Sequence, residues 1–168
     1  MEHIKVLHIV GYKNSGKTTL VSNWVRLAKS LKLKVAVIKH HGHGAKLAMP
    51  DKTKDSMQYL AAGADASLVA GGGFTQHIMQ HELTYERLLA LAKLENPDVI
   101  LIEGYKEEAG EKAVLVKEPV DWETLQELNN IQLVIGLENE QLPYEQIDHR
   151  ENQIALEQWF TAWVKDDL

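Results

Sequence analysis

A chain of 168 residues with 45% hydrophobic and 25% charged residues has the composition of a globular protein, and its length predicts one domain over 1–168. The net charge of −6 argues against non-specific binding to nucleic acid or to an anionic membrane, so neither is an expected partner. The lack of cysteine excludes disulfides and thiolate metal sites. We expect a cytoplasmic protein, because the sequence has neither a signal-peptide pattern nor an apolar run of membrane-spanning length.

The first half of the chain alternates apolar runs with helical patterns. In chain order these predict a strand over 3–10, a helix over 17–31, a strand over 34–39, a polar loop over 41–54, a helix over 56–63, a strand over 65–70, a turn and a second strand within 71–82, and a helix over 84–94. Asp55, with Gln58 in a capping-box pattern, is expected to cap the second helix, and Thr84 the third.

The second half predicts strands over 98–104, 113–117 and 132–138, and a final helix capped by Asp148 and Glu151. The apolar stripe of that helix comprises Leu156, Trp159, Phe160, Trp163 and Val164, and core packing explains it better than a groove for a partner. Strands that alternate with helices predict a three-layer α/β sandwich with a mostly parallel sheet, to which the strands between 65 and 82 add an antiparallel hairpin.

The segment "GYKNSGKTTL" has the residues and spacing of a phosphate-binding loop. Glycines at positions 11 and 16 allow the backbone N–H groups to surround phosphate oxygens. Lys17 would then reach the β- and γ-phosphates, and the Thr18 hydroxyl suits Mg²⁺. The helix that follows favours an anion at its N-terminus. Lys17 is therefore the expected catalytic residue. The expected nucleotide-binding residues are Gly11, Tyr12, Lys13, Asn14, Ser15, Gly16, Lys17, Thr18, Thr19 and Asp55.

An acidic residue at the end of a neighbouring buried strand would complete a Mg²⁺ site. Glu103 ends the run "DVILIE" and is the predicted partner of Thr18 at the metal. Asp98, at the start of the same strand, is expected to be structural. Asp55 has two interpretations that the sequence leaves open: a helix cap, or a carboxylate near the metal and the γ-phosphate. Lys52 and Lys54 beside it are expected to be solvated or to contact phosphate.

Arginine commonly stabilises the charge on a transferred phosphoryl group. The chain has only Arg26, Arg87 and Arg150, and we expect all three on helices away from the loop. Hydrolysis is therefore expected to be slow. The guanine-reading pattern Asn-Lys-x-Asp is absent as well, so the sequence does not decide between GTP and ATP.

Histidines cluster after the second predicted strand, at His40, His41 and His43. Imidazoles so close in sequence can share a transition metal, but such a cluster is more often a solvated loop or a contact to a polar ligand. His77 and His81 fall on the predicted hairpin and are expected at the surface or at an interface.

Four segments together resemble the adaptor proteins of molybdopterin-guanine dinucleotide biosynthesis, the MobB family: "GYKNSGKTTL", "VIKHHGHG", "DKTKDS" followed by "AGAD", and "LIEGYK". The resemblance covers residues 4–117. It implies a P-loop NTPase sandwich, GTP and Mg²⁺ as ligands, weak GTPase activity and a homodimer. It also implies molybdopterin and the guanylyltransferase that joins GMP to it as partners.

Two other functions stay open at this point. A small-molecule kinase would use the loop over 41–54 as a lid. A nickel-type metal-insertion GTPase would use a histidine-bearing loop, but such proteins usually carry cysteine motifs that this chain lacks. In ParA-like ATPases a second lysine directly follows the first loop glycine, whereas here Tyr12 holds that place and Lys13 comes one residue later.

Overall fold

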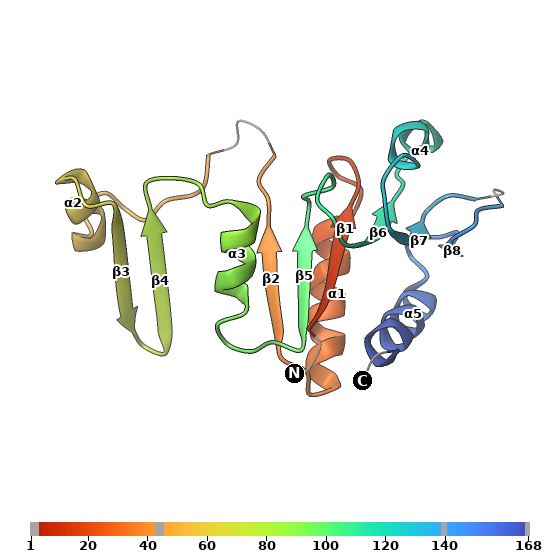
Figure 1. The fold of residues 1–168 in the computed structure, drawn as a ribbon, viewed down its shortest axis with the longest axis horizontal. Helices are drawn as coiled ribbons and strands as arrows, with labels where there is room; N and C mark the ends of the chain where they lie inside the picture. Colours follow the sequence, from red (N-terminus) through yellow and green to blue (C-terminus); the bar gives the residue numbers. More distant parts are fainter. Residues whose placement is uncertain (1–3, 43–45, 139–140, 167–168) are drawn as a thin grey trace.

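The main sheet consists of six parallel strands in the spatial order β2-β5-β1-β6-β7-β8 (Figure 1). The computed structural model describes residues 4–42, 46–138 and 141–166. The strands of this sheet are β1 (Lys5–Val10), β2 (Val35–Lys39), β5 (Val99–Glu103), β6 (Glu111–Leu115), β7 (Ile131–Ile135) and β8 (Glu145–Ile147). Strands β1 and β5 are central and almost fully buried, as expected for a parallel sheet covered on both faces.

Helices cover both faces of this sheet. On one face, α1 (Lys17–Ser30) and α5 (Gln153–Lys165) pack over alternate residues of the strands. On the other face lie α3 (Tyr85–Ala92) and α4 (Pro119–Leu125), each over its own apolar cluster. The resulting three layers confirm the predicted α/β sandwich.

The aromatic stripe of α5 belongs to the core. Trp24 of α1 is fully buried, and its ring lies 5.0 Å from that of Phe160 and 5.7 Å from that of Trp159. All five residues of the predicted stripe are buried. Core packing, rather than a groove for a partner, therefore explains the stripe.

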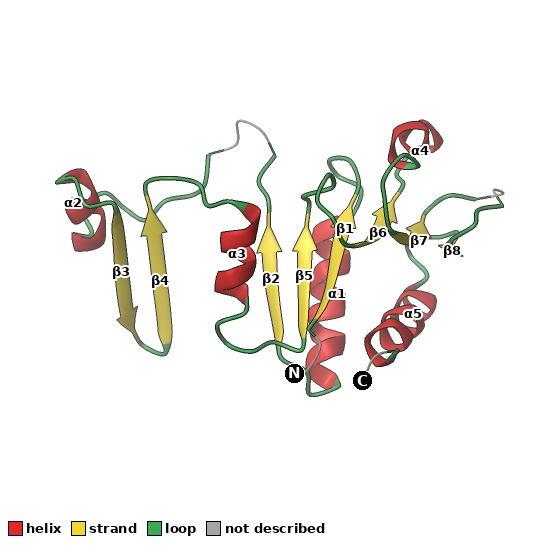
Figure 2. Cartoon of the chain, viewed as in Figure 1, coloured by secondary structure: helices red, strands yellow, loops and turns green. Residues whose placement is uncertain are grey.

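An antiparallel hairpin lies apart from the main sheet, together with a short helix (Figure 2). Its strands are β3 (Ala66–Gly71) and β4 (Phe74–Met79), and the helix α2 (Asp55–Ala61) precedes them. The turn residues Gly72 and Gly73 both have positive φ angles, as a two-residue hairpin turn requires. The hairpin addition was predicted correctly.

Several local predictions are wrong. Helix α4 and strand β8 were not predicted, and they have only seven and three residues. The N-cap of α2 is Lys54, and the Gln58 side chain donates to the Thr53 carbonyl instead of completing a capping box with Asp55. The α5 cap is Asn152, whose side chain accepts from the Ala155 N–H, rather than Asp148 or Glu151.

Two predicted roles at element ends are confirmed. Thr84 caps α3 and accepts from the Arg87 N–H. The Asp98 carboxylate accepts a hydrogen bond from the Lys34 N–H at 2.6 Å and so joins the starts of β2 and β5.

None of the helices in the described ranges is long and apolar enough to cross a lipid bilayer.

Candidate functional site

Three neighbouring parallel strands end at the same edge of the sheet, and polar residues follow there. The loop after β1 carries the glycine-lysine-threonine motif. In the register of the sheet, Glu103 at the end of β5 is paired with both Ile9 of β1 and Lys39 of β2. The carboxyl edge of an open parallel sheet is where α/β proteins bind their ligands.

The loop after β1 requires glycine at its first position. Gly11 has a φ angle of 149°, and a Cβ added there would lie 2.5 Å from the Leu115 carbonyl oxygen. Gly16 and Asn14 also have positive φ angles, of 99° and 64°. Helix α1 then begins at Lys17 with no side-chain cap and no acidic residue in its first turn. Its first N–H groups are thus left for an anion, and the helix dipole favours one.

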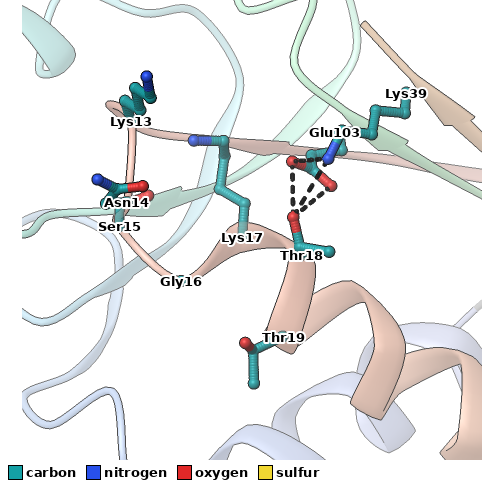
Figure 3. Close-up of a pocket in the computed structure, with 9 residues that line it drawn as sticks. All are labelled: Lys13, Asn14, Ser15, Gly16, Lys17, Thr18, Thr19, Lys39 and Glu103. Atoms are coloured by element: carbon teal, nitrogen blue, oxygen red, sulfur yellow. Dashed lines mark hydrogen bonds and ion pairs between the residues drawn. The ribbon is translucent and has the colours of Figure 1, made fainter. Parts of the chain in front are cut away.

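The motif lines a pocket of about 380 Å³ (Figure 3). Its lining residues are Lys13, Asn14, Ser15, Gly16, Lys17, Thr18, Thr19, Lys39 and Glu103. None of them carries a large apolar side chain, and three are lysines. The pocket is therefore suited to a highly charged anion rather than to an apolar ligand.

Lys17 is held against the loop itself. Its Nζ donates to the carbonyl oxygens of Gly11 at 2.8 Å and of Tyr12 at 2.7 Å. Gly11 and Tyr12 therefore contact the motif lysine without lining the pocket. Burial lowers the pKa of Lys17; the Glu103 carboxylate opposes this and the Lys39 ammonium adds to it. A polyanion in the pocket would stabilise the charged form of Lys17 and raise its pKa again.

Thr18 and Glu103 lie in direct contact. The Thr18 hydroxyl donates to the Glu103 carboxylate oxygens at 3.0 and 3.1 Å, and Glu103 is only 8% exposed. The Lys39 Nζ lies 3.2 Å from Glu103 Oε1 and also donates to Thr18 Oγ1 (Figure 3). A hydroxyl and a carboxylate fit a Mg²⁺ ion that takes its other ligands from phosphate and water. For that the Lys39 ammonium has to move, because it is paired with the same carboxylate.

The structure does not bring every predicted residue to this pocket. Asp55 is the exposed first residue of α2, which lies at the far end of the molecule from the loop in Figure 1. The His40 ring stacks on Tyr105 at 4.4 Å and lies 3.9 Å from the Glu82 carboxylate. His43 lies outside the described residues. The described part of the chain has no group of three or more His, Cys, Asp or Glu residues placed to hold a metal.

Four polar residues expected at the surface are exposed. His77 on β4 and His81 after it are both exposed, as predicted. Lys52 and Lys54 are exposed as well, and neither lines the pocket of the loop.

Two residues of the site were missed. Lys39 could have been found, because it ends the second predicted strand and the ends of parallel strands share one edge. Arg150 corrects an explicit prediction: it lies between β8 and α5, and its guanidinium donates to the Ser15 carbonyl oxygen at 3.3 Å. Only Arg26 and Arg87 are on helices. No local pattern marks Arg150, because the chain segment before α5 reaches the loop only in the folded protein.

The parallel sheet, the loop that leads from its central strand into α1, and the carboxylate on the adjacent strand together define a protein of the P-loop NTPase type. The profile of the family described as molybdopterin guanine dinucleotide synthesis protein B matches residues 6–137. The chain therefore belongs to this family, MobB.

Relatives and solved structures agree with this assignment. A probable molybdopterin-guanine dinucleotide biosynthesis adapter protein of Bacillus subtilis is 35% identical over 129 residues, which are 77% of this chain and 75% of the relative. The crystal structure of a MobB homolog from Bacillus stearothermophilus has a TM-score of 0.77 at 32% identity, covering 96% of this chain and 98% of that one. Bacillus subtilis MobB superposes with a TM-score of 0.79 at 29% identity, covering 94% and 97%.

Proposed function

We propose that this protein is a GTP-binding adaptor of molybdenum-cofactor biosynthesis. It would assist the guanylyltransferase that forms molybdopterin guanine dinucleotide, and would present nucleotide or molybdopterin to that enzyme. The observation that best supports nucleotide binding is the pocket of the phosphate loop. In it the Lys17 ammonium donates to a loop carbonyl oxygen, and the Thr18 hydroxyl donates to the Glu103 carboxylate. Family membership and the printed names of the relatives support the biosynthetic role.

In this proposal the chain's own groups bind and orient the nucleotide. The loop N–H groups and the start of α1 hold the phosphate oxygens, and Lys17 leaves the carbonyls of Gly11 and Tyr12 to neutralise β- and γ-phosphate charge. Thr18 and Glu103 would hold Mg²⁺, which would neutralise phosphate charge when bound.

Weak GTPase activity is part of the proposal. None of the described residues that line the phosphate pocket is an arginine. Arg150 touches the other side of the loop, at the Ser15 carbonyl, and does not line this pocket. Without an arginine aimed at the transferred phosphoryl group the developing charge is poorly stabilised, so turnover is expected to be slow unless a partner supplies one.

We also propose a homodimer in which the exposed apolar side chains of the hairpin contact a second copy of the chain. Leu68, Val69 and Phe74 are 67%, 46% and 83% exposed. Val69 and Phe74 lie on one face of the hairpin and Leu68 on the other. Exposed apolar side chains on so small a unit favour contact with another protein surface, and the family resemblance favours a second copy of this chain.

The Lys17→Ala variant tests the nucleotide part. We expect the affinity for Mg²⁺–GTP to fall about 10- to 100-fold, because a hydrogen bond to a charged group contributes roughly 1.5–3 kcal/mol. Calorimetric titration measures it, with GTP and ATP in competition to establish the base preference. Lys93→Ala, which removes the same charge from an exposed site at the end of α3, is the matched control. Unchanged affinity in Lys17→Ala would remove the loop from the proposal.

The adaptor part needs the partner enzyme. Purified guanylyltransferase is assayed for dinucleotide formation alone, with this protein, and with its Lys17→Ala variant. We expect only the wild-type protein to raise the rate. Equal stimulation by the variant would separate the adaptor role from nucleotide binding, and no stimulation by either protein would contradict the role.

A further inference from the structure

A second cavity of about 350 Å³ adjoins the phosphate pocket, on the side of α1 and α5. It shares Asn14, Ser15, Gly16 and Thr19 with that pocket, so the two are continuous along the loop. Its volume falls within the range of roughly 300–1,000 Å³ that small-ligand sites occupy. A ligand whose phosphates lie on the loop therefore has space beside it for a further group.

The lining of this cavity differs from that of the phosphate pocket. Four aliphatic side chains, each at most 5% exposed, contribute to it, and none lines the phosphate pocket: Leu20, Leu115, Ile135 and Leu156. Polar side chains, among them Asn23 and Gln153, surround the rest. A surface of aliphatic carbon with a few polar groups fits a flat heteroaromatic ring with its sugar.

Arg150 is placed at the junction of the two spaces. It donates to the Ser15 carbonyl oxygen at 3.3 Å and lines the second cavity. Its stem passes close to Gly136: a Cβ there would lie 2.9 Å from the Arg150 Cγ and 2.5 Å from the Val116 carbonyl oxygen. A guanidinium has five N–H donors in one plane, and this one makes a single hydrogen bond to the described part of the chain. The remaining donors can serve a ligand.

Glu151 is the one carboxylate among the described residues that line this cavity. Its carboxylate makes no hydrogen bond or ion pair within the described ranges. An ionised carboxylate only accepts hydrogen bonds. Guanine offers it two donors, the ring N1–H and the 2-amino group, whereas adenine offers a lone pair at N1.

We propose that this cavity holds the ribose and the guanine base of the nucleotide whose phosphates lie on the loop, with Arg150 beside the sugar-phosphate junction and Glu151 as the residue that selects guanine. The proposal rests on the proposed function and adds to it the nucleoside subsite and the source of base preference, which the absence of an Asn-Lys-x-Asp pattern had left open.

Titration with inorganic triphosphate, GTP, ITP and ATP, all with Mg²⁺, tests it. ITP lacks only the 2-amino group of guanine. We expect the wild-type protein to bind GTP at least about tenfold more tightly than triphosphate, ITP or ATP. Glu151→Gln should remove most of the preference for GTP over ATP and leave triphosphate binding unchanged. Glu123→Gln, at an exposed carboxylate on α4, makes the same charge change away from both cavities and should alter nothing.

The Arg150→Ala variant tests the role of Arg150 beside the sugar-phosphate junction. We expect it to weaken GTP binding several-fold more than triphosphate binding, and Arg150→Lys to restore only part of the loss, because lysine lacks the planar set of donors. An equal loss for both ligands would overturn this role for Arg150 and leave it as a support of the loop.

The outcomes also separate this inference from the proposed function. If wild-type protein binds triphosphate as tightly as GTP, the nucleoside subsite is overturned while phosphate binding by the loop stands. If Glu151→Gln keeps the full preference for GTP, the selecting role of Glu151 is overturned. If the protein binds neither ligand, the proposed function fails and the subsite with it.

Discussion

Lys39 and Thr18 both contact the Glu103 carboxylate at the carboxyl edge of the sheet. These contacts hold the carboxylate beside the phosphate loop, where its 8% exposure keeps it largely out of water. A buried carboxylate needs a partner, and Mg²⁺ can take the place of the Lys39 ammonium. In the proposed function, the Glu103 carboxylate would exchange the Lys39 ammonium for Mg²⁺ when nucleotide binds.

The Glu103→Gln variant tests the metal role. An amide keeps an oxygen that the Thr18 hydroxyl can donate to but loses the negative charge, so we expect nucleotide affinity in EDTA to be nearly unchanged. The gain in affinity that Mg²⁺ provides should fall by about tenfold or more. Calorimetric titrations with and without Mg²⁺ measure both quantities. A full Mg²⁺-dependent gain in the variant would exclude Glu103 from the metal site.

His8 gives a residue-scale prediction about pH. It is fully buried on β1, with Nε2 at 3.0 Å from the Tyr85 hydroxyl. Burial lowers the pKa of His8 below its ordinary value of 6.5, and the nearby Lys112 ammonium lowers it further, while a backbone hydrogen bond with Gly104 opposes the shift. The unfolded chain therefore takes up this proton first as the pH falls, and stability contributed by neutral His8 is lost below about pH 6.5.

Thermal melting across this range, in the wild-type protein and in His8→Gln, measures that contribution. We expect the variant to be less stable at neutral pH, because it loses the contact with Tyr85, and to show a shallower fall in melting temperature below about pH 6.5. The two proteins share all other titrating groups, so the difference in slope belongs to His8. Identical slopes would contradict the assignment.

At the scale of single elements, α5 packs in one core cluster with α1 and with residues of β1, β5, β6 and β7. Its aromatic side chains stack on Trp24 of α1, and the Trp24 indole N–H donates to the Leu156 carbonyl oxygen at 3.2 Å. The segment just before α5 carries Arg150 to the phosphate loop and Glu151 to the second cavity. Packing of the last helix therefore positions the residues that we assign to the nucleoside subsite.

Removing a core ring from α5 should destabilise the whole fold. Phe160 is fully buried, and we expect Phe160→Ala to lower the free energy of unfolding by about 3–5 kcal/mol. Ile154, on the same helix but 71% exposed, is the matched control, and Ile154→Ala should change it by less than about 0.5 kcal/mol. Urea unfolding measures both variants. Similar losses at the two positions would show that Ile154 is buried in solution.

At the scale of the whole molecule, the hairpin of β3 and β4 leaves large apolar side chains exposed to solvent. Its strands pair with each other but not with the main sheet, and Phe74 at its turn is 83% exposed. Isolated hairpins are at best marginally stable in water. Contact with a second copy would cover these side chains and stabilise the unit.

Sedimentation velocity tests this interface. We expect the wild-type protein to be a dimer at micromolar concentration, and the double variant Leu68→Ser, Phe74→Lys to shift towards monomer. The exposed Leu94→Ser, at the end of α3, is the control for loss of surface apolar area. A wild-type monomer would contradict the dimer, and a dimeric double variant would place its interface elsewhere.

The sequence by itself determined the sandwich, the hairpin and the phosphate loop, because each depends on local signals: apolar periodicity, a glycine turn, and a fixed spacing of Gly11, Gly16 and Lys17. Short elements with weak periodicity, α4 and β8, escaped prediction, since they form only where the rest of the fold already lies beside them.

Only the tertiary structure decided that Arg150 meets the loop. Parallel pairing aligns strand ends, so Glu103 was predicted beside Thr18, and the same rule applies to Lys39. Arg150 reaches the loop through the packing of α5 against α1. The tertiary structure also left Asp55 away from the pocket, on a helix that belongs to the hairpin. Contacts between segments more than a hundred residues apart depend on how layers pack, and no local pattern in the chain records that.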